Sequence, residues 1–144
     1  MPAASLTKFE PFVADKNNGE HNLGSDTLRV ALTNTAPVAT QGAFDPGTNH
    51  PPPAAANGYP TGGGALTLTS STQTGGVYKL VVADFVFTAT AGGIGPFRYA
   101  VLYNDTNASD KAIGFYDYGS SITVGDGETF TFDADPTNGL FTDT

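Results

Sequence analysis

Residues 76–90 read GVYKLVVADFVFTAT, and this stretch decides the fold. It is too long for one straight strand of ordinary length. In its first half, alternate positions hold the bulky residues Tyr78, Leu80 and Val82. In its second half, bulky residues fall at the opposite parity, at Phe85 and Phe87. Because alternate residues of a strand share one face, the change of parity at positions 83–84 predicts a bulge or a crossing of the chain between two sheets.

Shorter runs with strand character surround this stretch. Leu28, Val30 and Leu32 alternate with their neighbours, which is typical of a half-buried strand. Similar runs occupy positions 65–72, 97–105, 111–119, 121–124, 128–134 and 139–143, and turn-forming residues separate most of them. About eight short strands at this spacing predict an all-β fold, with a single domain over residues 1–144 built as a β-sandwich or jelly roll.

Aromatic residues recur in the predicted strands. In the run 97–105, one side of the strand is expected to carry Phe97, Tyr99, Val101 and Tyr103. Tyrosines at alternate positions favour packing in the core or across strands, and this applies to Tyr99, Tyr103, Tyr116 and Tyr118. A contact between subunits is the alternative, because tyrosine buries a large area at small entropic cost.

Signals for helices are sparse. The chain holds 18 glycines and 10 prolines. In a helix interior, glycine costs about 1 kcal/mol and proline about 3 kcal/mol relative to alanine. Residues 8–18 are therefore interpreted as an edge strand broken by Pro11, and residues 1–18 together as an N-terminal arm or edge strand.

One long stretch departs from the strand pattern. Residues 33–64 read TNTAPVATQGAFDPGTNHPPPAAANGYPTGGG and hold almost no periodic apolar signal. Structureless stretches of this length are uncommon inside compact domains, and the prolines at 51–53 favour an extended polyproline II course. Two interpretations remain open for this Pro- and Gly-rich segment: a surface loop, or an extended arm that lies across a neighbouring subunit and is ordered only there.

The charge balance limits the possible partners. Fourteen acidic residues against six basic ones give a net charge of −8. Phosphate backbones bind proteins through Lys and Arg, so nucleic acid and anionic membranes are poor partners. Arg29 and Arg98 lie in predicted strands of this acidic chain, which favours a structural ion pair over recognition. Residues 1–12 lack the pattern of a signal peptide and no apolar run is long enough to span a membrane, so a soluble protein is expected.

Reactive groups do not gather in the sequence. There is no cysteine, which excludes disulfides, zinc–thiolate sites and thiol catalysis. The histidines are His21, before a strand, and His50, in the Pro-rich segment, while Ser120 and Ser121 lack a G-x-S-x-G elbow and are expected to cap a turn. The glycine-rich runs TGGGA (61–65) and GGIGPF (92–97) lack the phosphate-binding and dinucleotide-binding patterns, and we interpret them as turns that need positive φ.

Carboxylates are numerous enough to require the same test. Asp126 and Glu128 flank one tight turn, and Asp133 and Asp135 flank another. Paired acids could serve a glycosidase, and Asp133, Asp135 and Asn138 could donate oxygens to Ca²⁺, but the spacing of a calcium loop is not met. Ordinary turns explain both pairs better. We therefore predict a protein that is not an enzyme, with no catalytic, cofactor-binding or metal-ligating residues and no cofactor.

Four phrases carry a resemblance to a known group of proteins. They are HNLGSDTLRVALTNTAPVAT, NGYPTGGGALTLTSSTQTGGVYKL, IGPFRYAVLYNDT and GFYDYGSSITVGDGETFTFD. The chain resembles small structural proteins of tailed double-stranded DNA bacteriophages over most of residues 20–142. The stretch 42–55, GAFDPGTNHPPPAA, departs from that likeness.

The resemblance implies a virion structural protein. The first expectation is a capsid decoration (cement) protein that binds the major capsid protein lattice on the outer surface of the head, after assembly in the host cytoplasm. A phage tail component or a host-surface (glycan) binding module is the alternative. The resemblance also implies a homo-oligomer, with a trimer favoured over a dimer. From their aperiodic composition, segments 1–18 and 33–64 are expected to contact the shell or neighbouring subunits.

Overall fold

The structure is a computed structural model, and it describes residues 5–143. Over this range there is one helix, α1 (Glu10–Asn17). The strands of the described residues are β1 (Thr7–Lys8), β2 (Leu28–Thr33), β3 (Ala55–Ala56), β4 (Gly64–Ala65), β5 (Leu68–Thr74), β6 (Val77–Val82), β7 (Phe85–Thr88), β8 (Ile94–Asn104), β9 (Ala112–Val124), β10 (Thr129–Phe132) and β11 (Phe141–Asp143). The all-β prediction is confirmed. Within these residues, no helix is long and apolar enough to cross a membrane.

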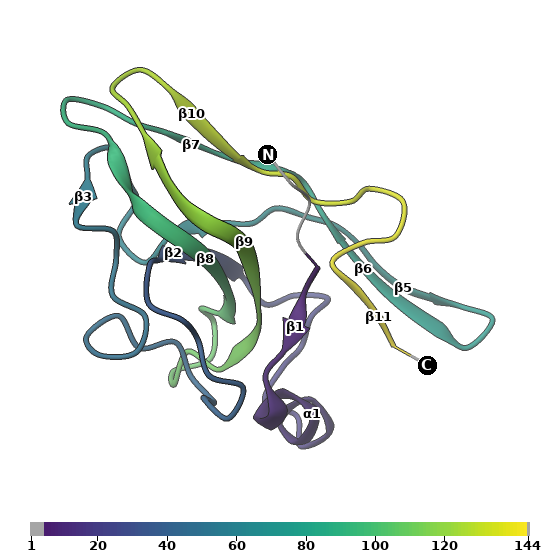
Figure 1. Cartoon of the computed structure of the whole chain (residues 1–144). Helices are drawn as coiled ribbons and strands as arrows, with labels where there is room; N and C mark the ends of the chain where they lie inside the picture. The colour runs from purple at the N-terminus through teal and green to yellow at the C-terminus, as the bar shows by residue number, and fades with distance from the viewer. Residues whose placement is uncertain (1–4, 144) are drawn as a thin grey trace.

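The strands form three antiparallel sheets (Figure 1). The main sheet has the order β1-β9-β8-β2-β4, and β3 pairs with one end of β8. Two small sheets have the orders β11-β6-β5 and β10-β7. The longest ladders, β8 with β9 and β2 with β8, lie in the middle of the main sheet. This central part is the scaffold on which the rest of the chain is placed.

The stretch 76–90 divides where its parity changes. β6 ends at Val82 and β7 begins at Phe85, and the two strands belong to different small sheets. Asp84, between them, accepts a hydrogen bond from the backbone N–H of Ala134 at 2.8 Å. That residue lies in the matching connection between β10 and β11. The predicted crossing of the chain from one sheet to another is therefore confirmed.

The principal core lies between the main sheet and the two small sheets. We call the side of the main sheet that faces it the inner face. Leu28, Val30 and Leu32 share this face, as their alternation predicted. The side chains that fill the core from the small sheets include Leu80, Val82, Phe87, Phe130, Phe132 and Phe141. Burial of each such side chain contributes about 1.5–3 kcal/mol to folding.

The opposite side of the main sheet, the outer face, is also covered. A second apolar cluster there consists of Phe9, Ala31, Phe44, Val101, Tyr103 and Ala112. Phe9 comes from the N-terminal region and Phe44 from the aperiodic segment 33–64, so neither belongs to a strand. β2 is consequently buried on both faces, with Ala31 only 1% exposed, where its pattern predicted a half-buried strand.

Two expectations about the long strands are wrong. Phe97 lies in the inner core, whereas Val101 and Tyr103 lie in the outer cluster, because the register between β8 and β9 shifts between Phe97 and Tyr99. β9 also runs without a break through Gly119, which has φ +87°. Ser120 and Ser121 are therefore strand residues and do not cap a turn.

The tyrosines expected in the core divide unequally. Tyr103, Tyr116 and Tyr118 are buried, and Tyr99 is half-buried. Arg98 lies over the ring of Tyr99, 5.3 Å from its centre. Arg98 also pairs with Asp117 at 2.8 Å, and Arg29 pairs with Asp105 at 2.9 Å. Both arginines thus hold the structural ion pairs that the sequence predicted.

The N-terminal region is the clearest correction. Thr7–Lys8 pairs at the edge of β9, but residues 10–17 form a helix instead of a broken strand. Pro11 falls in the first turn of α1, where the missing N–H has no helical acceptor and costs nothing. Phe12 is buried and its ring packs edge-on against Phe141. Residues 1–4 of the predicted arm lie outside the described residues.

The segment 34–63 lies against its own main sheet. Ala43 bridges to Lys111, the N–H of Phe44 donates to the carbonyl of Asp110 at 2.8 Å, and β3 pairs with the start of β8. Of the two interpretations of this segment, its course agrees with a surface loop and differs from an arm that is ordered only on a neighbouring subunit. Phe44 packs against Tyr103 on the outer face of the same chain, and this contact holds the segment against the sheet.

Candidate functional site

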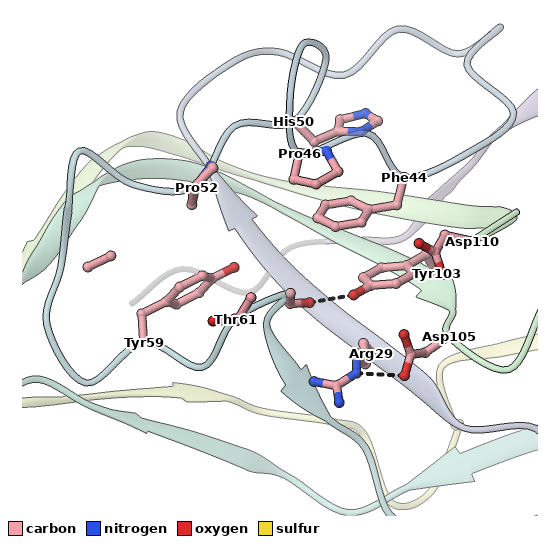
Figure 2. Close-up of a pocket in the computed structure, with 12 residues that line it drawn as sticks. Arg29, Phe44, Pro46, His50, Pro52, Tyr59, Thr61, Tyr103, Asp105 and Asp110 are labelled. Carbon is pink, nitrogen blue, oxygen red and sulfur yellow. Dashed lines mark hydrogen bonds and ion pairs between the residues drawn. The ribbon is translucent and has the colours of Figure 1, made fainter. Parts of the chain in front are cut away.

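A cavity of about 500 Å³ lies between the aperiodic segment and the outer face of the main sheet (Figure 2). Its volume is within the range of small-molecule sites. β2, β8 and the β8–β9 connection form one side, through Arg29, Tyr103, Asp105 and Asp110. The opposite side is formed by Phe44, Pro46, His50, Pro52, Ala56, Tyr59, Thr61 and Gly62.

Three rings form the apolar wall of the cavity. Phe44 stacks on Tyr103 with 4.2 Å between ring centres, and on His50 with 5.8 Å. Figure 2 shows Phe44 lying between the other two rings. The hydroxyl of Tyr103 donates to the carbonyl of Gly62 at 2.6 Å. Burial raises the pKa of Tyr103, so its hydroxyl stays a neutral donor.

His50 is a structural residue of this wall. Its side chain is buried, and Nδ1 accepts a hydrogen bond from the N–H of Asp45 at 3.1 Å. Nε2 lies 2.9 Å from Oε1 of Gln41 and must be the protonated nitrogen, since Nδ1 is an acceptor. Burial lowers the pKa of His50, although the nearby Asp45 carboxylate acts in the opposite direction. The ring is therefore neutral and both nitrogens are engaged, which leaves no free base.

The polar end of the cavity combines one cation and two carboxylates. Nε of Arg29 donates to Asp105 at 2.9 Å, and Nη1 donates to the carbonyl of Gly63 at 3.1 Å. Among the described residues, the side chain of Asp110 has no hydrogen-bond partner and no ion pair. Burial raises the pKa of Asp110, and the charge of Asp105 adds to this. Asp110 also adopts φ +48°, a left-handed conformation that Asp tolerates better than most residues.

Tyr59 and the glycines that follow it close the cavity. The hydroxyl of Tyr59 accepts a hydrogen bond from the N–H of Leu32 at 2.9 Å, and burial raises its pKa to about 12. Gly62 and Gly63 have φ +82° and +92°, which confirms the predicted turn in TGGGA. A Cβ on Gly63 would lie 2.2 Å from the carbonyl oxygen of Val30. The close approach of this turn to β2 therefore requires glycine.

The residues weighed as catalytic candidates are not brought together. His21 bonds through Nδ1 to the amide of Asn104, whereas His50 lies in the cavity wall. Ser121 donates to Asn34 at 3.0 Å. Over residues 5–143, no hydrogen bond joins a histidine to Ser120 or Ser121. The structure thus assembles no Ser–His pair from them.

The acidic candidates close their own turns. Glu128 accepts from the N–H of Gly125 at 2.7 Å, across the turn that carries Asp126. Asp135 accepts from the N–H groups of Thr137 and Asn138. These bonds confirm the interpretation of both stretches as turns. No group of three or more His, Asp or Glu residues in the described part of the chain is arranged to hold a metal ion.

The sequence did not predict the cavity. Arg29, Asp105 and Asp110 are ordinary strand or turn residues in the sequence, and the fold alone places them together. A usable signal was the presence of Phe44 and Tyr59 in an aperiodic Pro- and Gly-rich segment, because a large aromatic residue in a loop requires an apolar partner.

Comparison with known proteins found no family model, no curated protein and no solved structure that matches this chain.

Proposed function

We propose that this chain is a bacteriophage virion structural protein, a capsid decoration protein that binds the lattice of major capsid protein on the outer surface of the head. It performs no catalysis in this role. The sequence resemblance motivates the proposal. The structural observation that carries it is the exposed edge of β5, which is suited to association with another protein chain.

The β5–β6 hairpin projects away from the main sheet (Figure 1). β5 pairs only with β6 in the described residues, so its other edge is free. Most of β5 and the turn that follows it are exposed. No Asp, Glu, Lys or Arg occurs from position 46 to 78, a range that includes all of β5. Soluble proteins usually protect such edges with charges or prolines, and this edge has neither.

An unprotected edge allows strand addition from a neighbour. Main-chain hydrogen bonds would supply the affinity and exposed side chains would set the register. Leu68 and Val77 are each 40% exposed on this hairpin and add apolar area to the contact. Repetition over a capsid lattice makes modest individual contacts sufficient, and the net charge of −8 disfavours binding to DNA.

The same proposal includes the architecture and the assembly. The inner core is shared by the main sheet and both small sheets, which supports a β-sandwich of jelly-roll type although the sheets are open at their edges. The chain forms a homo-oligomer, a trimer in preference to a dimer. Light scattering after size-exclusion chromatography tests this, and a monomer both in solution and on the particle would contradict it.

The edge is tested by adding charge to it. The double variant Thr72→Lys/Thr74→Lys places two cations on β5, and we expect it to lose binding to capsids that lack the protein. The matched control Thr35→Lys/Thr40→Lys makes the same charge change on exposed residues of the aperiodic segment. Loss of binding in the control alone would assign the contact to that segment and refute the β5 edge.

Copy number separates decoration from a tail role. A decoration protein occurs in virions at the same order of magnitude as the major capsid protein, whereas a tail component occurs in few copies. Quantitative gel staining of purified virions measures this ratio. A handful of copies per particle would refute the proposal in favour of a tail or host-binding component.

A further inference from the structure

We propose that the cavity on the outer face binds a neutral sugar, one hexopyranose residue of a glycan. This role goes beyond virion assembly, because it uses the cavity on the outer face and not the exposed edge of β5.

The walls of the cavity suit one face of a sugar ring. Half of the lining residues are aromatic or proline, among them Tyr59, Pro46 and Pro52 in addition to the stacked Phe44 and Tyr103. Figure 2 shows the ring of Tyr59 at the end of the cavity away from Asp110. Pyranose rings carry C–H groups on their faces, and these pack on such surfaces through the hydrophobic effect.

The polar groups suit hydroxyls. Arg29 uses Nε and Nη1 within the protein, and Asp105 uses one oxygen, Oδ2. Nη2 of Arg29, Oδ1 of Asp105 and both oxygens of Asp110 have no partner among the described residues. Thr61 adds a hydroxyl to the lining, beside Tyr59 in Figure 2. Donors and acceptors therefore stand side by side, and a hydroxyl is the ligand group that both donates and accepts.

The charges of the lining disfavour an anionic ligand. Arg29 contributes one positive charge, and Asp105 and Asp110 contribute two negative ones, while His50 is neutral. The net charge of the lining is negative, which opposes a carboxylate or phosphate ligand. The same net charge attracts a cation and Arg29 only reduces that attraction, so a cation is the competing ligand that the variants below must exclude. A neutral polyhydroxyl ligand satisfies all three groups.

Substitutions of Asp110 distinguish a neutral sugar from a cation. Its left-handed φ of +48° is compatible with glycine and asparagine. Asp110→Gly removes the side chain without backbone strain, and Asp110→Asn removes the charge but keeps an acceptor oxygen. A neutral sugar should tolerate Asp110→Asn and not Asp110→Gly, whereas a cation should be lost with either.

Binding is measured by amide chemical shifts in the intact protein. The probes are the methyl glycosides of glucose, galactose, mannose and N-acetylglucosamine, with tetramethylammonium and glucuronate as charged comparators. We expect at least one glycoside to shift the amides of Gly62, Gly63 and Asp105 with a dissociation constant of about 1–10 mM, as for a ligand of this size. Glucuronate should bind more weakly than glucose.

The variants then distinguish the outcomes. Asp110→Gly should weaken binding of that glycoside about tenfold or more, Asp110→Asn about threefold or less. Asp117→Ala, which breaks the ion pair with Arg98 outside the cavity, should leave it unchanged. Absence of any glycoside-induced shift at about 50 mM, tighter binding of tetramethylammonium, or an unaltered Asp110→Gly variant would each overturn the sugar site. None of these results affects the capsid assay, so the two proposals fail independently.

Discussion

The two faces of the main sheet are covered in different ways. The inner face meets strands of the small sheets, and its core is built from residues at alternating strand positions. The outer face meets the N-terminal region and a segment with almost no strand of its own. Strands of the small sheets cover the inner face, whereas the irregular segment leaves a cavity of about 500 Å³ over the outer face. Sheet residues under the loop segment, such as Ala31 and Val101, are therefore as buried as those under the small sheets, yet the outer face retains room for a ligand.

The largest expected effects compare one phenylalanine from each face. Phe97 is fully buried in the inner core and Phe44 is 9% exposed on the outer face. We expect Phe97→Ala to lower the free energy of unfolding by about 4 kcal/mol and Phe44→Ala by about 3 kcal/mol. Urea unfolding measures both. A cost below about 1 kcal/mol for Phe44→Ala would show that the loop-covered face adds little to stability.

The turn that returns the segment to the sheet gives the next effect. Gly63→Ala places a Cβ against the Val30 carbonyl at a residue with positive φ. We expect this variant to lower the free energy of unfolding by about 3 kcal/mol. Gly75→Ala is the matched control, because φ is +60° there and nothing lies within 4 Å of the added Cβ. Gly75→Ala should lower the free energy of unfolding by only about 1 kcal/mol. Equal losses would mean that backbone strain, not the contact with β2, limits Gly63.

Acid should weaken the outer face through His50. Its pKa in the folded state is lowered by burial, so the unfolded chain binds the proton more readily. Stability is therefore retained above the unfolded pKa near 6.5 and is lost as pH falls below it, by at most about 1.4 kcal/mol per pH unit. The His50→Gln variant should show a flatter dependence between pH 7.5 and 5.5. His21 remains in both proteins, so parallel curves would exclude His50 as the source.

The smallest effect concerns the ion pairs on the strands. Arg29 and Asp105 are both partly exposed, and Asp105→Asn should lower the free energy of unfolding by about 0.5 kcal/mol. The pair of Arg98 with Asp117 is more exposed, and Asp117→Asn should give no measurable change in the free energy of unfolding. The loss caused by Asp105→Asn should be smaller in high salt than in low salt, because salt screens the charges of the partly exposed pair. A loss larger than that of Asp105→Asn would show that the more exposed pair of Arg98 with Asp117 contributes more to stability than the pair of Arg29 with Asp105.

The core beside the inner face could be predicted, because the alternation of apolar residues along a strand indicates which side chains share a face. The alternation of Leu28, Val30 and Leu32 and the parity change at 83–84 gave the correct faces and the correct sheet crossing. Both patterns depend only on residues close together in the sequence, and regular pairing keeps alternate residues of a strand on the same face. The same reasoning misassigned Phe97, since a register shift against β9 is set by a distant strand and leaves no local mark.

The helix and the cavity were missed for different reasons. Pro11 was interpreted as a strand breaker, although proline in the first turn is compatible with a helix. The cavity depends on tertiary placement: Arg29, Phe44 and Asp110 lie far apart in the sequence and meet only after the segment is laid over the sheet. No catalytic residue was predicted, and the histidines, serines and acids weighed for that role occupy separate parts of the fold.

Eight of the twelve residues that line the cavity come from positions 44–62, and four come from the sheet and its connection. Apart from Phe44, which packs on the outer face, the residues that this segment contributes to the cavity lie in a connection, and connections tolerate exchange of residues better than strands do. The segment therefore supplies most of the apolar lining, whereas the charged side chains of Arg29, Asp105 and Asp110 come from β2 and the β8–β9 connection. Grafting a different segment between β2 and β4 should yield a protein of altered selectivity on an unaltered scaffold.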